Sequence, residues 1–200
     1  MFDKDREAIF DAMAPEWGKR ALSSPSDTLC RMLEDLALAG KVILDVGAGT
    51  GALVEAGLRQ NPKRWICCDL STAMLAQIQA SWEENPVVEV LQADAHCLPL
   101  EDASFDIVIC NAVLPHFHNR RQVLKELERI LRPNGQLAIN HFIGRHRVNQ
   151  IHQSSAHSLL RGDLLPAAEV VVMELRALRF DINEAVDNED RYFILATKAC

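Results

Sequence analysis

Short apolar runs alternate with helix-like segments through the middle of the chain, and this alternation restricts the possible folds more than any other feature. The helix-like segments are Ala52–Arg59, Thr72–Trp82 and Arg120–Leu131. The apolar runs are Val42–Val46, Trp65–Cys68, Val87–Leu91, Phe105–Cys110 and Gln136–Phe142. Continuous apolar strands separated by helices predict an α/β fold in which both faces of a parallel sheet are covered.

The two ends of the chain have other patterns. Near the N-terminus, Asp5–Met13 reads as a short helix that ends before Pro15 and Gly18, and Ser26–Leu38 reads as a second one. Near the C-terminus, the segment 167–178 has helical spacing and precedes two short strands at 182–186 and 191–197. The polar connection between these strands is hairpin-like, so we expect them to be antiparallel.

Size, charge and composition exclude several classes of function. The chain has 200 residues, which suits one α/β domain spanning 1–200. Its net charge of -7 disfavours nucleic acid as the main partner, because phosphate binding needs a basic face. No apolar stretch approaches about 18 residues and the first ten residues have no apolar run, so we expect neither a membrane span nor a signal peptide. The six cysteines include no CxxC pair, and we expect buried reduced thiols in a cytoplasmic protein.

A glycine-rich turn follows the first predicted strand. Residues 45–51 read Asp-Val-Gly-Ala-Gly-Thr-Gly. Glycine suits a sharp turn at which a ligand approaches the backbone and meets free N–H groups at a helix start. The turn alone does not decide the ligand, because Gly47, Gly49 and Ala52 also satisfy the dinucleotide pattern, with Asp69 at the distance expected for a ribose-binding acid. A nicotinamide-dependent oxidoreductase is therefore an alternative at this point.

Four features favour S-adenosylmethionine (SAM) over a dinucleotide. Asp45 stands two residues before the first glycine, where a carboxylate attracts an ammonium group and repels a pyrophosphate. Asp69 and Leu70 end the second strand with an acid for two ribose hydroxyls and an apolar side chain for adenine. Asp94 ends the third strand, where it can accept from the adenine amino group. The antiparallel strand pair at the C-terminus is the fourth feature.

Five segments in order resemble the class I SAM-dependent methyltransferases, and in particular the small-molecule branch that includes the ubiquinone and menaquinone C-methyltransferases. They read VILDVGAGTG, CCDLSTAML, LQADAHCLPL, FDIVICNAVLPHF and LERILRPNGQLAI. The resemblance covers residues 40–142, and residues 10–17 resemble the segment that covers the cofactor in that branch. It implies a doubly wound sheet of seven strands, six parallel and the last antiparallel, with a helical cover over 1–39.

The resemblance also implies which residues bind SAM. Asp45, Gly47, Ala48, Gly49 and Gly51 would hold its methionine part. The remaining predicted contacts are Asp69 with the ribose, Leu70, Asp94 and Ala95 with the adenine, Asn111 and Ala112 with the methyl-donor end, and Trp17 closing over the cofactor. One departure from the branch is Gly18, which follows Trp17 where an acid is often found.

Histidines provide the candidates for acid–base chemistry. In an open parallel sheet, ligands bind at the carboxyl ends of the strands, and His116 and His118 follow the fourth strand there. His141 follows the fifth strand, and a neutral imidazole can take a proton near neutral pH. His116 matches a histidine found after this strand in many relatives, and residues 141–166 correspond to a substrate lid. The five-residue spacings of the histidines in that segment argue against a metal site, since helical metal ligands usually stand three or four apart.

The predicted reaction is methyl transfer from SAM to a small organic acceptor by in-line displacement, with S-adenosylhomocysteine (SAH) as the second product. Proximity and exclusion of water supply most of the catalysis, and a base helps when the acceptor must lose a proton. The sequence leaves the acceptor, the methylated atom and the oligomeric state open. Two other readings remain, a SAM-binding regulatory or partner protein with little catalysis and the nicotinamide-dependent oxidoreductase. Cyclopropanation is a further SAM reaction, and the compact lid makes it less attractive.

Overall fold

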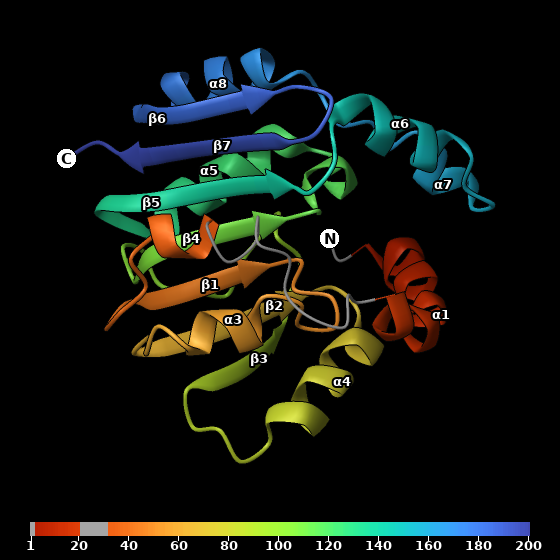
Figure 1. Ribbon diagram of the computed structural model, residues 1–200, viewed down its shortest axis with the longest axis horizontal. Coiled ribbons are helices and arrows are strands. Elements are labelled where there is room, and N and C mark those ends of the chain that lie inside the picture. The colour runs from red at the N-terminus through yellow and green to blue at the C-terminus, as the bar shows by residue number, and fades with distance from the viewer. Residues whose placement is uncertain (1–2, 21–31) are drawn as a thin grey trace. The chain divides into compact units, whose positions relative to one another are not determined.

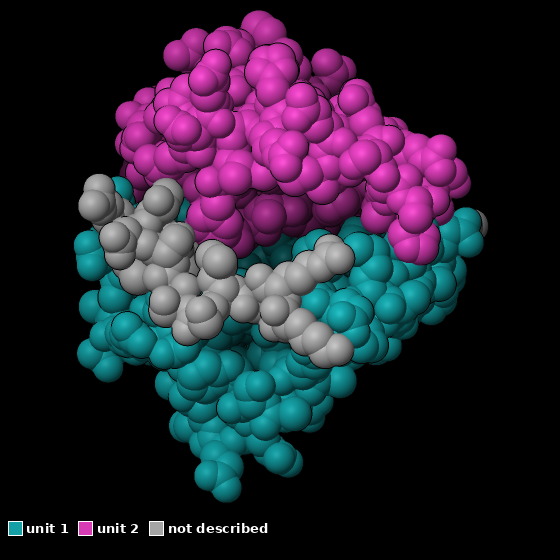
Figure 2. Space-filling view, turned by 45° about the vertical axis from the view of Figure 1, so that its right-hand side comes forward, with its two compact units in different colours: residues 1–94 teal, residues 95–200 magenta. Residues whose placement is uncertain are grey.

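The computed structural model describes residues 3–20 and 32–200. Contacts within the chain divide it into two compact units, residues 1–94 and residues 95–200 (Figure 2). Among the residues described, no helix is long and apolar enough to cross a membrane. The division does not test whether 1–200 behaves as one domain, which stays a prediction.

The first unit is a three-stranded parallel sheet with helices. Its strands follow the order β3-β2-β1, and both neighbouring pairs are parallel. In chain order the elements are α1 (Lys4–Arg20), a helical segment at 32–35, β1 (Val42–Val46), α3 (Val54–Leu58), β2 (Arg64–Asp69), α4 (Thr72–Trp82) and β3 (Val88–Gln92). Helix α1 packs against α4 (Figure 1).

Local sequence explains most of this unit. All five residues of β1 are buried, as expected for a strand covered on both faces. Helix α4 begins at a true N-cap, because the Ser71 hydroxyl accepts from the Met74 N–H at 3.1 Å. Trp65 is fully buried beside Gly57 of α3, where a Cβ atom would collide with the indole ring. That helix can therefore lie close to β2 only because it carries glycine there.

The expected end of the first helix was wrong. Helix α1 continues through Pro15 instead of ending before it. Proline removes one N–H from a helix, but tertiary bonds to α4 hold the residues just before Pro15 in place. Asp11 accepts from the Ala73 N–H at 3.0 Å, and the Ala14 carbonyl accepts from Gln77 at 2.7 Å. Most of the second predicted helix, Ser26–Leu38, lies outside the described residues.

The second unit contains the other four strands, in the order β4-β5-β7-β6. Strands β4 and β5 are parallel, and β7 is antiparallel to both β5 and β6, as the hairpin predicted. The elements in chain order are β4 (Phe105–Asn111), the 3₁₀ turn η1 (Leu114–His116), α5 (Arg120–Ile130), β5 (Leu131–His141), α6 (Arg145–Gln153), α7 (Ser158–Arg161), α8 (Ala168–Ala177), β6 (Phe180–Asp187) and β7 (Tyr192–Lys198).

The complete strand order is β3-β2-β1-β4-β5-β7-β6. Seven strands, mostly parallel with an antiparallel C-terminal strand, confirm the predicted α/β fold class. The strand that departs most from its predicted bounds is β5, which begins at Leu131 rather than Gln136. A register shift places 132–135 out of line with β4, and Asn134 has a φ of 64° within it. Such a bulge interrupts the apolar pattern without ending the strand.

Candidate functional site

The glycine-rich turn after β1 adopts a conformation that requires glycine. Gly47, Gly49 and Gly51 have φ angles of 70°, 54° and 85°, which lie in the left-handed region. A Cβ at Gly51 would meet side-chain carbons at 3.1 and 3.3 Å, so this glycine also allows close packing. The N–H groups of Gly47 and Ala48 donate to the Cys68 carbonyl at 2.8 and 3.1 Å. The turn is thereby fixed to the end of β2.

Asp69 closes the turn from the end of β2. One carboxylate oxygen accepts from the Gly49 N–H at 2.8 Å, and the other accepts from the Ser71 N–H at 2.9 Å. Burial raises the pKa of Asp69, and these backbone N–H groups act in the opposite direction. Each carboxylate oxygen has a second lone pair, so the residue can hold the turn and still accept from ligand hydroxyls.

Helix α1 brings Trp17 to the same turn. A Cβ built on Gly49 would lie 3.5 Å from the indole nitrogen of Trp17. The helix is attached to the start of α4 by Asp11, which accepts from the Ser71 hydroxyl at 2.5 Å. The structure therefore brings together Trp17, Gly49 and Asp69, three of the predicted cofactor-binding residues.

Asp45 is the most unusual ionisable group of the first unit. Its side chain is buried at the end of β1, and its Oδ2 atom has no hydrogen-bond partner among residues 3–20 and 32–200. Burial, reinforced by the charge of Asp69, raises the pKa of Asp45 to about 7, against a smaller opposite effect of the Trp65 indole. A nearby cation would favour the ionised form of this carboxylate.

The other predicted cofactor contacts lie at the ends of strands. Leu70 follows β2 and is half-buried, and Ala93 donates its N–H to the Asp69 carbonyl at 3.1 Å just after β3. Asp94 is half-buried beside it and is the last residue of the first unit. Ala95 is buried and begins the second unit.

An asparagine pair orders the end of β4 in the second unit. The amide of Asn140 on β5 donates to Asn111 Oδ1 at 2.9 Å, while the Asn140 side chain is fully buried. The Asn140 carbonyl accepts from the Ala112 N–H at 2.8 Å, and Ala112 has a φ of 56°. The predicted residues Asn111 and Ala112 are thus both held by one residue of the neighbouring strand.

Three histidines and one aspartate form a cluster in the second unit. His116 Nδ1 lies 2.7 Å from Asp163 Oδ2, and both side chains are largely buried. His152 Nδ1 contacts the main-chain carbonyl of Asp163, and the rings of His116 and His152 are 5.0 Å apart. His141 is buried, and no described residue forms a hydrogen bond with its Nε2 atom. Burial, and then the charges of His116 and His152, lower the pKa of His141 to about 3.

The structure brings together two of the three predicted catalytic histidines. His118 is exposed and stacks on His96, with ring centroids 3.8 Å apart, rather than joining His116 and His141. Sequence reasoning missed Asp163, although a signal existed: it is the only acidic residue between Glu128 and Glu169. Across the described part of the chain, no group of three His, Cys, Asp or Glu side chains could hold a metal ion.

Comparison with known proteins places this geometry in a family. Residues 44–139 match the family described as methyltransferase domain. The chain therefore carries a methyltransferase domain. The matched domain implies SAM as the methyl donor.

Individual relatives agree with this assignment. The chain is 33% identical over 139 residues to a malonyl-[acyl-carrier protein] O-methyltransferase of Halorhodospira halophila, covering 66% of this chain and 46% of that protein. It is 34% identical over 140 residues to a demethylmenaquinone methyltransferase of Clavibacter sepedonicus, covering 68% of this chain and 57% of that one. The chain thus spans about half the length of these relatives.

A solved structure shares the fold. The putative methyltransferase in a complex with the Trm112 methyltransferase activator of Haloferax volcanii superposes with a TM-score of 0.80 at 17% identity, over 96% of this chain and 98% of that one. At this identity the likeness establishes the fold alone.

The residues of the first unit fit the methionine and ribose parts of SAM. The glycine N–H groups of the turn are bonded within the protein rather than free, so the acceptor side chains carry the fit. Among the described residues the Oδ2 atom of Asp45 has no partner, and it supplies a negative centre for an ammonium group. Asp69 supplies acceptors for ribose hydroxyls, as described above. A pyrophosphate would meet two carboxylates at this turn, which disfavours a dinucleotide.

Proposed function

We propose that this protein transfers a methyl group from SAM to a small organic acceptor, with His116 as the general base. Donor binding is assigned to the glycine turn, Asp45, Asp69 and Trp17 of the first unit. Acceptor handling is assigned to the histidine cluster of the second unit, with residues 141–166 as the lid. A cytoplasmic location is part of the proposal and is supported by the absence of disulfides among the described cysteines.

The observation that carries the proposal is the closure of the glycine turn by Asp69. The 2.8 Å bond from the Gly49 N–H fixes the conformation of the turn, and the same carboxylate can accept from ribose. SAM already carries an activated methyl group, so the chain's own task is to orient the reactants, exclude water and remove a proton from the acceptor. His116, largely buried and bonded through Nδ1 to Asp163, is the side chain best placed for the last step.

Thermal unfolding with SAH, SAM, NADH or no ligand tests the donor assignment. A ligand at about 100 times its Kd stabilises a protein by about 2.7 kcal/mol, which is roughly 5–10 °C for a chain of this size. We expect this shift with SAM and SAH but not with NADH. A shift with NADH alone would indicate that the glycine turn binds a dinucleotide instead of SAM.

Two glycine variants provide a matched comparison. Gly49→Ala and Gly40→Ala both place a Cβ at a positive φ, 54° and 69°, and should lose similar stability. Only Gly49 belongs to the turn, and no atom lies within 4 Å of a Cβ at Gly40. We expect SAH binding to weaken in Gly49→Ala and to persist in Gly40→Ala. Equal weakening of SAH binding in both variants would show that the turn does not belong to the binding site.

A further inference from the structure

The contact between His116 and Asp163 joins two distant parts of the second unit. His116 ends the 3₁₀ turn after β4, and Asp163 follows α7, 47 residues later. The Asp163 side chain is only 6% exposed, so its charge is not screened by bulk water. A carboxylate accepts and does not donate, so the proton of neutral His116 lies on Nδ1 and the lone pair lies on Nε2.

Asp163 also orders a second imidazole. Its main-chain carbonyl accepts from His152 Nδ1, so this proton is fixed in the same way. The two rings are tilted by 31° with centroids 5.0 Å apart. One residue thus sets the tautomers of both histidines, through its side chain for His116 and its main chain for His152.

His141 and Tyr192 add two neutral polar side chains to the surroundings of this cluster. His141 is held neutral by burial, and its ring packs edge-on against Tyr192. The Tyr192 hydroxyl is buried and has no hydrogen-bond partner in the described part of the chain. The two guanidinium groups that act on Tyr192 are each held by a carboxylate. Arg120 binds Glu174 through two bonds of 2.7 and 2.9 Å, and Arg145 binds Asp187 at 2.9 Å.

This charge pattern favours one class of acceptor. A carboxylate acceptor is already ionised near neutral pH, so it needs no base, and it would be repelled by Asp163. A hydroxyl acceptor such as a phenol is neutral at that pH and must lose its proton as the methyl group arrives. It can also pair with the buried polar atoms of His141 and Tyr192, which would otherwise stay unsatisfied.

We infer that the acceptor is a neutral hydroxyl compound, with a phenol or enol as the reacting group, and that Asp163 is the positioning residue of His116. The inference rests on the methyltransferase function proposed above. The acceptor oxygen forms a bond to the methyl carbon of SAM while the sulfur–methyl bond breaks and releases SAH. The O–H bond of the acceptor breaks at the same time, and its proton passes to Nε2 of His116. The resulting imidazolium is stabilised by the Asp163 carboxylate.

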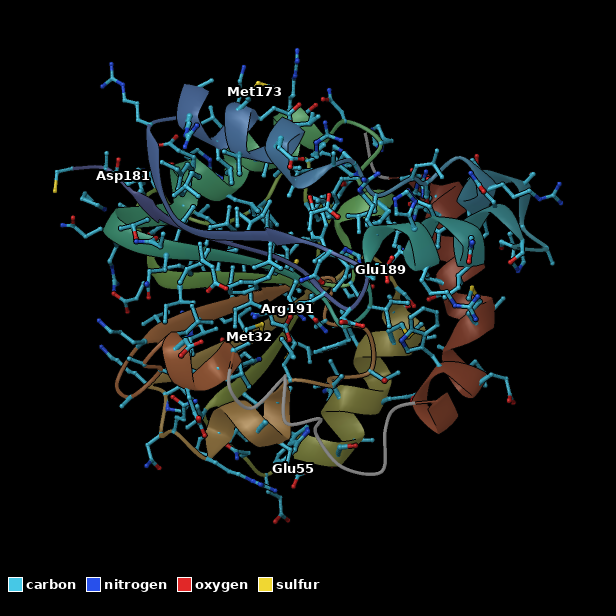
Figure 3. All side chains as sticks on the ribbon, turned by 45° about the horizontal axis from the view of Figure 1, so that its top comes forward. Met32, Glu55, Met173, Asp181, Glu189 and Arg191 are labelled. Carbon is cyan, nitrogen blue, oxygen red and sulfur yellow. The ribbon has the colours of Figure 1, made fainter. Side chains whose placement is uncertain are left out.

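Asp163→Asn is the decisive variant. It keeps the shape of the side chain and the main-chain carbonyl that binds His152, while it removes the charge and introduces an N–H donor. An amide can donate to Nδ1, which reverses the tautomer of His116. Asp181→Asn is the matched control, because Asp181 lies exposed on the edge strand β6 (Figure 3). His157→Gln controls for loss of an exposed histidine in the same segment.

The assay follows SAH release and the mass of the methylated product with catechol, 4-nitrophenol, malonate and benzoate. We expect wild-type protein to methylate the phenols and not the carboxylates. For catechol, Asp163→Asn should lower kcat about 10²–10⁴-fold, while SAH affinity and thermal stability change little. The loss should shrink for 4-nitrophenol, whose hydroxyl ionises near neutral pH without a base. A merely structural role would reduce kcat by the same factor for both phenols.

Nitrogen-15 spectra of histidine-labelled protein test the tautomer without turnover. We expect a His116 signal, assigned by its loss in His116→Gln, with the proton on Nδ1 in the wild type and in Asp181→Asn but not in Asp163→Asn. An unchanged tautomer in Asp163→Asn, or methylation of carboxylates in preference to phenols, would overturn the inference. Failure to bind SAH would instead refute the proposed function, so the two failures are distinguishable.

Discussion

Binding of SAH should depend on pH through Asp45. The carboxyl of Asp45 has a pKa of about 7 in the ligand-free protein, because it is buried close to Asp69. The amino-acid part of SAH carries an ammonium group, which favours the ionised carboxylate. Binding should therefore release a proton, and affinity should rise as the pH increases through 7.

The size of the effect follows from the ionised fraction. With a pKa of about 7, Asp45 is about 9% ionised at pH 6 and about 91% ionised at pH 8. If only the ionised form binds, the apparent Kd falls about tenfold between these values, which is about 1.4 kcal/mol. Tenfold is the upper limit, reached when the protonated form does not bind at all.

Isothermal titration with SAH at pH 6, 7 and 8 measures this dependence. At pH 7, buffers of different ionisation enthalpy should reveal release of about half a proton per ligand. Asp45→Asn keeps the volume but cannot ionise, so its affinity should be low and nearly independent of pH. The same affinity for wild-type protein at pH 6 and pH 8, with no proton release, would refute the link between Asp45 and the cofactor.

Three further predictions concern stability and reactivity. Gly57→Ala should destabilise the fold by about 1–3 kcal/mol in denaturant unfolding because its Cβ would collide with the Trp65 ring, whereas Gly162→Ala, with no atom closer than 3.9 Å, should be neutral or slightly stabilising. Because the pKa of His141 is lowered to about 3, only the unfolded state takes up a proton at this residue between about pH 6.5 and pH 3. His141 should therefore reduce the free energy of unfolding as the pH falls through that range. The dependence of the free energy of unfolding on pH should be weaker in His141→Phe. A thiol reagent should label the exposed cysteines quickly and the buried ones only after unfolding. The reason is that burial raises the pKa of the Cys67 and Cys68 thiols. Labelling of Cys67 or Cys68 as fast as Cys97 would contradict this prediction. Among the five cysteines that the structure describes, Cys97 and Cys200 are exposed, and Cys67, Cys68 and Cys110 are buried.

Elements defined by local signals could be predicted well. Strand β1 and helix α4 have the predicted bounds. A buried apolar run defines the strand and a serine N-cap begins the helix, and each signal lies within a few neighbouring residues. The course of α1 through Pro15 could not be predicted, since it depends on bonds to a helix about 60 residues away. Tertiary contacts of this kind override local helix signals.

The candidate site also contains residues that the sequence could predict and residues that it could not. The glycine turn and Asp69 belong to short motifs in which spacing specifies geometry. Asp163 belongs to no motif, and its importance comes from a contact with His116 across 47 residues. The separation of His118 from the cluster had no sequence signal, because two residues in one loop can point in different directions once the chain leaves a regular element.

The attachment of helix α1 has a consequence for the kinetics of cofactor exchange. Asp11 accepts from Ser71 and Ala73 at the start of α4, next to the Asp69 carboxylate that closes the glycine turn. Detachment of α1 would break both bonds and move Trp17 away from the turn in one event. We therefore expect the dissociation rate of SAH to follow the opening rate of this helix. Asp11→Ala should accelerate dissociation more than it slows association, so the N-terminal helix would set the residence time of the cofactor.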